Sequence, residues 1–210
     1  MKAKRRFNIW LWVLLCVPCL LASCDHDVHD GEDEGGLSVS LTWADEADQG
    51  TDVKDVKLWI FNADDGSLVE EKHYGSAQEV ASQRFQLPEG TYRILTTTNL
   101  TEPFFISEQT RSLTNWNNIQ IGLTNPKDVR NNAYFGVTDV KIDNKEGNYV
   151  VQNPIRSVLA ELTIIIENIP KGTEMSGKVL DCAWCLFPTL KNSDGEYGLP
   201  SIEPTEVELP

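Results

Sequence analysis

Apolar and polar residues alternate along most of the chain from Leu37 onward, and this two-residue period constrains the fold more than any other feature. Successive side chains of a strand point to opposite faces of a sheet, so the pattern predicts strands with one covered and one open face. In the segment 37–43, the apolar side chains that would share one face are Leu37, Val39, Leu41 and Trp43. We find no long, capped helical repeat in the sequence, and the predicted fold class is therefore all-β.

Further segments with strand patterns are separated by turn residues, and their spacing predicts a β-sandwich. The segment 56–61 (VKLWIF) is apolar at nearly every position, which is typical of a strand covered on both faces. The other candidate strands of this unit are 67–74, 82–88, 91–100, 118–124 and 134–142.

After residue 153 the pattern indicates a second unit, with strands expected at 158–166 and 178–187 and a last extended piece at 204–210. The roughly fifty residues available are few for an independent sandwich. We therefore predict a β-sandwich domain at 37–152 and a short partial second β domain at 153–210. The second unit is expected to dock against the first or to be completed by a strand from a partner.

The N-terminal segment 1–23 is predicted to be a signal peptide, because four basic residues within positions 2–6 precede an apolar run at 7–21. This run is shorter than the about 20 residues that a membrane-spanning helix needs. Residues 21–24 (Leu-Ala-Ser-Cys) resemble the bacterial lipobox, in which the cysteine is acylated and the chain is cut before it. Cys24 is therefore the predicted lipid attachment site, which would tether the protein to a membrane. An ordinary secretory signal with an incidental cysteine is the alternative.

Residues 24–36 are predicted to form a flexible stalk between the lipid and the fold. Their acidic side chains cannot bury apolar area, and they repel one another, which extends the chain. These side chains are Asp25, Asp27, Asp30, Glu32, Asp33 and Glu34. The run resembles the signal that sends lipoproteins of Bacteroidetes to the outer face of the outer membrane, and a spacer without an addressing role is the alternative.

Charge and cysteine content exclude two classes of protein. Removal of residues 1–23 takes away four of the 18 Lys and Arg residues and none of the 32 acids, which leaves 14 basic side chains and a net charge of −18. So acidic a surface is a poor partner for nucleic acid. Of the five cysteines only Cys182 and Cys185 would remain in the folded part, which excludes a disulfide scaffold.

The sequence predicts no catalytic residue, cofactor or metal site, and hence no enzyme. His26 and His29 lie among acids in the stalk, where nothing would hold them in a metal-binding geometry. Cys182 and Cys185 have redox-motif spacing, but they lie in a strand pattern, which favours packing thiols. The Asp, Asn and Gly clusters near residues 64, 143 and 194 fit turns rather than the calcium loop of an EF-hand.

The order of segments along the chain carries a family resemblance. Residues 53–100 contain an apolar strand, an Asp-Gly turn, a return strand and the stretch LPEGTYRIL. With AYFGVTDVKI (133–142) and SVLAELTIIIENIP (157–170), this order resembles the FimB-like fimbrial anchor and fimbrillin lipoproteins of Bacteroidetes. The resemblance implies transthyretin-like Greek-key sandwiches and a lipid-anchored surface subunit that joins fimbrial protein subunits by β-strand complementation. Such proteins have two sandwiches, whereas this chain is expected to stop early in the second.

A surface glycan-binding lipoprotein of a nutrient-uptake system is the alternative function. It would share the lipobox, the stalk and the sandwich, and an exposed platform of aromatic rings, on which sugars stack, would distinguish it from the fimbrial role. Trp43, Trp59 and Trp184 lie in strand segments, where core packing is expected, whereas Trp116 is predicted to be exposed in a loop. Buried tryptophans would favour the fimbrial role.

Overall fold

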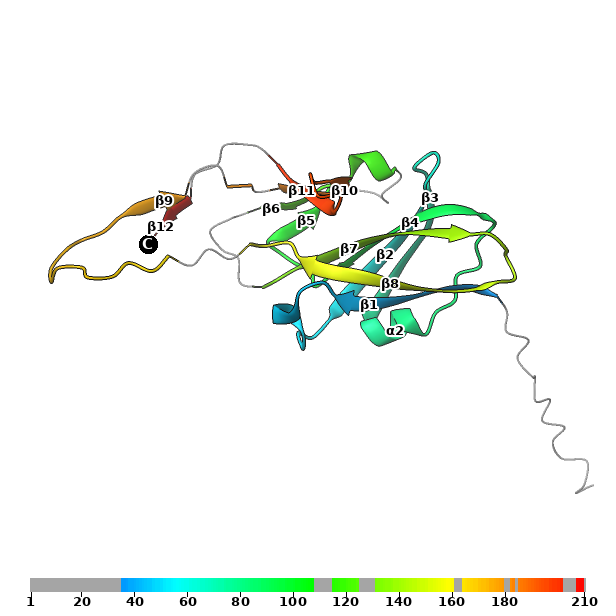
Figure 1. Cartoon of the computed structure of the whole chain (residues 1–210). Coiled ribbons are helices and arrows are strands. Elements are labelled where there is room, and N and C mark those ends of the chain that lie inside the picture. The colour runs from blue at the N-terminus through cyan, green and yellow to red at the C-terminus, as the bar shows by residue number, and fades with distance from the viewer. Residues whose placement is uncertain are drawn as a thin grey trace, which may run out of the picture. The chain divides into compact units, whose positions relative to one another are not determined.

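The structure is a computed structural model, which describes residues 35–107, 115–124, 131–160, 164–179, 182–183, 185–201 and 207–209. Strands of three sheets make up most of these residues, and the predicted all-β class is confirmed (Figure 1). Helical structure in the described ranges is limited to α2 (Ala77–Ala81) and two single 3-10 turns. No helix among the described residues is long and apolar enough to cross a membrane.

The largest sheet has six strands in the order β1-β8-β7-β4-β2-β3. Their bounds are β1 (Gly36–Trp43), β2 (Lys54–Asn62), β3 (Leu68–Ser76), β4 (Gly90–Thr98), β7 (Tyr134–Ile142) and β8 (Asn148–Ser157). All neighbours are antiparallel except β1 and β8, which run parallel in continuous register from Gly36–Asn148 to Trp43–Ile155. β1 is therefore an edge strand held by β8 along its whole length.

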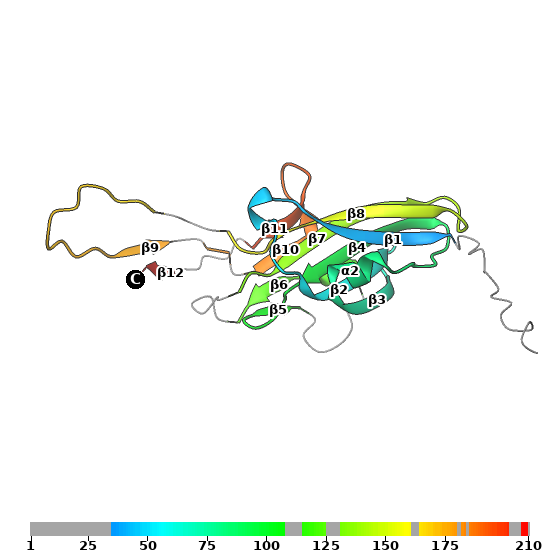
Figure 2. The same cartoon turned by 90° about the horizontal axis from the view of Figure 1, so that it is seen from below.

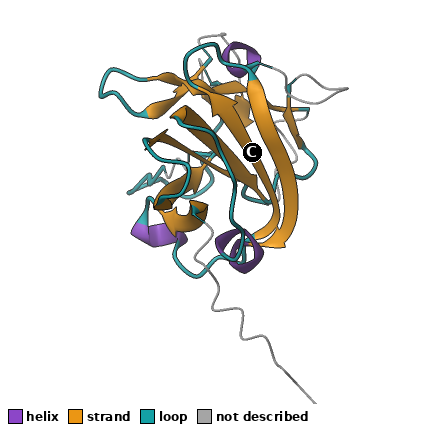
Figure 3. Ribbon diagram, turned by 90° about the vertical axis from the view of Figure 1, so that its right-hand side faces the viewer, coloured by secondary structure: helices purple, strands orange, loops and turns teal. Residues whose placement is uncertain are grey.

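The six-stranded sheet curls, because β8 parts from β7. β8 pairs with β1 along residues 148–155 and with β7 only at its end, where residues 155–157 meet residues 134–136. Together with α2, β1 and β8 form a layer beneath β7, β4, β2 and β3 (Figure 1), and the end-on view shows the curl (Figure 3). The first core lies inside this curl and includes Leu37, Val39, Val80 and Ile94.

β2 is covered on both faces, as its continuous apolar run predicted. Leu58 and Ile60 pack into the core inside the curl, whereas Trp59 and Phe61 pack into a second core on the opposite face. All four side chains are buried. The alternation of consecutive side chains between two cores explains why this segment has no polar face.

A four-stranded sheet covers the outer face of β4 and β7, in the order β11-β10-β6-β5 (Figure 2). Its bounds are β5 (Phe104–Ile106), β6 (Ile121–Leu123), β10 (Cys185–Lys191) and β11 (Tyr197–Pro200). β10 pairs with β6, so a strand from the C-terminal part extends a sheet begun by residues 104–123. The predicted division at residue 153 stays a prediction, and the residue itself lies within β8.

Three predicted strand segments were wrong in detail. The segment 82–88 makes only a single bridge, Leu37 to Phe85, and follows α2, a helix that the alternation did not indicate. Ser76 and Glu79 begin this helix as a capping box: the Ser76 hydroxyl accepts from the Glu79 N–H, and the Glu79 carboxylate accepts from the Gly75 N–H.

The other two wrong segments lie after β8. Of 158–166, the described residues form no strand, because β8 ends at Ser157. Of 178–187, the described strand residues belong to two separate strands, β9 (Gly177–Val179) and β10. β9 pairs with β12 (Val207–Leu209) in a two-stranded sheet.

Candidate functional site

The predicted lipid attachment site and stalk lie outside the described residues. Cys24, the six stalk acids, His26 and His29 all fall in the segment 1–34. Their roles therefore stay predictions from the sequence.

The two cysteines and the acidic clusters that the sequence analysis considered lie within the described residues, and their contacts are visible. The Cys185 thiol donates to the side-chain oxygen of Gln120 at 3.3 Å, and the Cys182 thiol to the main-chain oxygen of Val179 at 3.7 Å. Both cysteines are half-buried. The acidic clusters near residues 64, 143 and 194 are turns in which Asn or Asp side chains accept main-chain N–H groups. Within the described ranges, no group of three or more His, Cys, Asp or Glu residues could hold a metal ion.

Trp116 is buried, and its predicted exposure was wrong. The 3-10 turn Trp116–Asn118 lies over β2, and the indole contacts Phe61 and Tyr197 edge to face at centroid distances of 5.4 and 5.8 Å. The Arg93 guanidinium lies 5.3 Å from the centroid of its ring. The stretch LTNWNN looked like a loop, but its tryptophan fills the second core.

The other described tryptophans form no sugar-binding platform either. Trp59 is 2% exposed, and Trp43 is partly covered and packs edge to face on Tyr134 at 4.9 Å. Trp184 lies outside the described residues. The burial of Trp59 and Trp116 therefore favours the fimbrial role over a glycan-binding platform.

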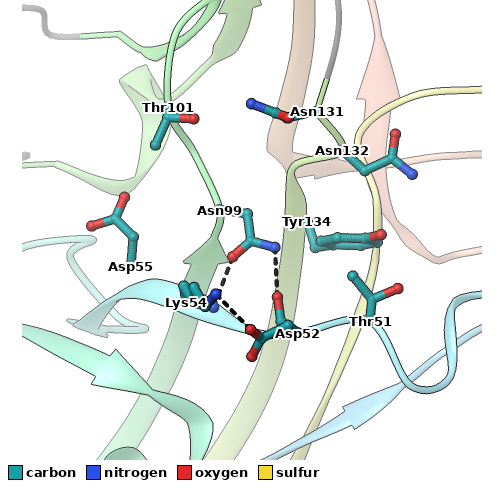
Figure 4. Close-up of a pocket in the computed structure, with 9 residues that line it drawn as sticks. All are labelled: Thr51, Asp52, Lys54, Asp55, Asn99, Thr101, Asn131, Asn132 and Tyr134. Carbon is teal, nitrogen blue, oxygen red and sulfur yellow. Dashed lines mark hydrogen bonds and ion pairs between the residues drawn. The ribbon is translucent and has the colours of Figure 1, made fainter.

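A polar hollow with a volume of about 590 Å³ lies where β2 and β7 begin and β4 ends (Figure 4). Residues from three separate stretches of the chain line it. They are Thr51, Asp52, Lys54, Asp55, Asn99, Thr101, Asn131, Asn132 and Tyr134. The sequence analysis missed this site, since its residues come together only when β4 and β7 pair.

Asn99 fixes the centre of the polar hollow. Its side-chain oxygen accepts from the Lys54 N–H at 2.8 Å, and its amide nitrogen donates to the Asp52 carbonyl at 3.0 Å (Figure 4). Its own N–H donates to the Lys54 carbonyl at 2.9 Å. The residue has a φ of +56°, which asparagine tolerates better than most residues. Three hydrogen bonds thus hold the end of β4 against the start of β2.

The charged residues of the hollow are already paired. The Lys54 ammonium lies 2.6 Å from the Asp52 carboxylate, and this hydrogen bond raises the pKa of Lys54 above its ordinary value of 10.5. The Asp55 carboxylate lies 2.6 Å from Nε2 of His73 on the neighbouring strand β3. Asp55 has a φ of +49°, so a second residue in the left-handed region lies in the same hollow.

The second surface feature is an exposed apolar segment, residues 164–169, which we call the isoleucine segment. Ile164, Ile165, Ile166 and Ile169 are 53, 79, 55 and 41% exposed. The segment belongs to no strand, and it forms no hydrogen bond with other described residues. Patches of exposed apolar side chains usually mark a surface that is covered by a partner.

Comparison with known proteins was made on sequence and on structure. A family model described as fimbrillin-A associated anchor proteins Mfa1 and Mfa2 matches residues 24–202. The chain belongs to this family. The predicted resemblance to fimbrial anchor proteins of Bacteroidetes is thereby confirmed, and it places the chain among fimbrial surface proteins. No match was found among curated proteins.

A solved structure of similar fold is an adhesin candidate from Bacteroides ovatus ATCC 8483, with a TM-score of 0.50 and 15% sequence identity. The match covers 82% of this chain and 60% of that protein. Another from Bacteroides ovatus has a TM-score of 0.45 and 20% identity over 59% and 45% of the two chains. The fimbrial anchor protein Mfa2 from Porphyromonas gingivalis has a TM-score of 0.43 and 16% identity over 58% and 50%. The chain thus spans about half the length of the solved proteins it matches.

Proposed function

We propose that this protein is a lipid-anchored subunit of the outer membrane that holds or caps a fimbria. The observation that carries the proposal is the family match, which runs from residue 24 to residue 202. The matched region begins at the predicted lipid attachment site, Cys24, and includes the acidic stalk. Lipid on Cys24 would hold the protein in the membrane, and the acids from Asp25 to Glu34 would direct it to the cell exterior.

The proposed link to fimbrial subunits is β-strand complementation at the isoleucine segment. Three consecutive β-branched residues, Ile164 to Ile166, favour an extended strand, and they would present apolar side chains on both of its faces. Their backbone groups have no partner among the described residues. A partner strand would supply main-chain hydrogen bonds, and a covering layer would bury the isoleucines.

The proposed role is structural rather than catalytic. The family is described by its association with fimbrillin, and anchor proteins of this kind act by binding. The buried Trp59 and Trp116 support this role over glycan capture by an aromatic platform.

Limited proteolysis of the full-length lipidated protein tests the strand-pairing proposal. Lys171 lies just beyond the isoleucine segment and is exposed, so trypsin should cut there in the protein alone. A fimbrial subunit purified from the same cell surface should protect this site. A variant with Ile164→Thr and Ile166→Thr provides the control, because it should be cut equally with and without the subunit.

Two results would contradict the pairing. One is a site at Lys171 that resists trypsin without any subunit, which would mean that the segment is already covered. The other is equal protection of the wild type and the double variant, which would place the subunit elsewhere.

A further inference from the structure

We propose that the polar hollow binds a neutral saccharide. Its volume of about 590 Å³ falls within the range of about 300–1,000 Å³ that is common for small-molecule sites. Residues 51–55, 99–101 and 131–134 converge on it from separate parts of the sequence (Figure 4). The inference goes beyond the proposed anchoring function and concerns a different surface from the isoleucine segment.

The walls of the hollow are fixed before any ligand arrives. Both ends of the Asn99 side-chain amide form hydrogen bonds with the main chain of Asp52 and Lys54. The Asp55 carboxylate pairs with His73 on the neighbouring strand β3. Two of the three non-glycine residues with positive φ in the described chain are Asn99 and Asp55. Unusual backbone conformations of this kind persist where surrounding contacts determine them, and they gather at binding sites.

Other groups in the hollow remain available to a ligand. The side chains of Thr101, Asn131 and Asn132 form no hydrogen bond with other described residues, and Asn131 and Asn132 are exposed. A hydroxyl and two amides supply both donors and acceptors. Each saccharide hydroxyl can also donate and accept, so the two sets match without a charged partner.

Charge and burial exclude the other ligand classes. Asp52 and Asp55 outnumber Lys54, and the chain carries a net charge of −14, so an anion is disfavoured. Both carboxylates already have cationic or imidazole partners, which reduces their attraction for a second cation. An apolar ligand would find mostly amides, hydroxyls and carboxylates. Tyr134 is 1% exposed and its ring packs on Trp43, so the site offers hydrogen bonds rather than a stacking surface.

The hollow lies at the end of β1 opposite to the end where the chain enters the fold. Trp43, at the end of β1, packs on Tyr134 in the wall, whereas the chain enters β1 at Gly36. The eight residues of β1 span roughly 25 Å at about 3.3 Å per residue. The hollow therefore lies about the length of β1 away from Gly36, where the predicted stalk joins the fold.

Saturation-transfer NMR on the full-length protein tests the proposal. The probes are the methyl glycosides of mannose, galactose, glucose and N-acetylglucosamine, with sialic acid and glucosamine as charged comparisons. At least one neutral glycoside should receive saturation, and its affinity should not depend on salt, because no charge pair forms. The double variant Thr101→Ala, Asn132→Ala should bind about tenfold more weakly, as expected for the loss of two neutral hydrogen bonds. The variant Asn117→Ala removes an exposed amide elsewhere and should bind as the wild type does.

Each other result would overturn the proposal. These results are no binding of any neutral glycoside, binding of sialic acid or glucosamine alone, and neutral binding that the double variant leaves unchanged. None of them bears on protection of Lys171 by a fimbrial subunit, so the two proposals fail independently.

Discussion

Asn99 joins the end of β4 to the start of β2 through both ends of its side chain, and the backbone has a positive φ there. Replacement by alanine removes two hydrogen bonds, each contributing about 0.5–1.5 kcal/mol, and adds about 1 kcal/mol of backbone strain. We therefore expect Asn99→Ala to lower the free energy of unfolding by about 2–4 kcal/mol in equilibrium urea unfolding. Asn99→Gly is the control, since it removes the hydrogen bonds without the strain and should lie between alanine and wild type. An alanine variant as stable as the wild type would show that the amide is not needed.

Asn153 is a buried polar residue at the point where β8 parts from β7. Its amide nitrogen donates to the Thr96 hydroxyl at 2.9 Å, and its oxygen accepts from the Thr138 hydroxyl at 2.9 Å. Asn153→Ala would leave the buried Thr96 hydroxyl without this partner, which should cost about 1–3 kcal/mol of unfolding free energy.

The triple variant Asn153→Ala, Thr96→Val, Thr138→Val removes all three polar groups and checks this explanation. It should recover part of the stability in the same urea experiment, because no buried group is then left unpaired. A triple variant that is less stable than Asn153→Ala would favour packing over hydrogen bonding as the role of Asn153.

Among the strands, Tyr197 links β11 to the six-stranded sheet. Its hydroxyl donates to Asp139 on β7 at 3.1 Å, and its ring packs on Trp116. Burial, followed by the charge and hydrogen bond of Asp139, raises the pKa of Tyr197 above its ordinary value of 10.0. The folded state therefore holds this proton more tightly than the unfolded state does, and the resulting stability is present below pH 10 and lost as the pH rises through the folded pKa.

We expect the melting temperature to fall as the pH is raised above about 10 and to fall less steeply in Tyr197→Phe. Burial also raises the pKa values of Tyr74 and Tyr92, so the variant should keep a smaller decline. Thermal unfolding followed by circular dichroism across this pH range checks it. Identical slopes in the two proteins would mean that Tyr197 does not contribute.

The isoleucine segment should contribute little to the stability of the protein alone. Because Ile165 is 79% exposed, Ile165→Ala should change the unfolding free energy by less than about 0.5 kcal/mol. Ile60 lies fully buried in β2, and Ile60→Ala should cost about 2–5 kcal/mol by the same measurement. A large loss in Ile165→Ala would show that the segment is packed in solution, against the proposal that it waits for a partner.

Local pattern predicted the long strands well, because their periodicity depends on burial in a sheet. The predicted segment 134–142 coincides with β7, and 56–61 lies within β2. It missed α2, a five-residue helix between the predicted segments 67–74 and 82–88, which begins at the capping residues Ser76 and Glu79. It also failed at Trp116 and at the polar hollow, since both depend on which distant strands become neighbours, and a single sequence does not specify that pairing.

At the scale of the whole molecule, attachment to the membrane is predicted to depend on a single thiol. Cys24→Ala should abolish acylation and release the protein from membranes, because the apolar run at 7–21 is too short to hold it. Membrane fractionation with metabolic palmitate labelling measures both effects. Retention of the variant in the outer-membrane fraction with unchanged labelling would refute the lipid anchor.

The stalk acids are predicted to act in export and not in folding. Replacing the acids from Asp25 to Glu34 with serine and asparagine should leave the unfolding free energy unchanged, since the stalk buries no apolar area. Protease shaving of intact cells should then show less protein at the surface. Equal digestion of the wild type and the variant on intact cells would show that the stalk is a spacer without a role in export.

The parallel pairing of β1 with β8 has a mechanical consequence. A pull on the tether reaches the fold at Gly36, and a fimbria bound at the isoleucine segment would pull beyond Ser157. These points lie at opposite ends of the parallel pair, so the tension runs along the strands and stretches all their hydrogen bonds together. In single-molecule stretching, we expect a higher rupture force between residues 36 and 157 than between residues 36 and 147, which adjoin and would peel the strands apart one bond after another. The force at which a fimbria detaches from the cell under flow would then depend on the shear strength of the hydrogen bonds between β1 and β8.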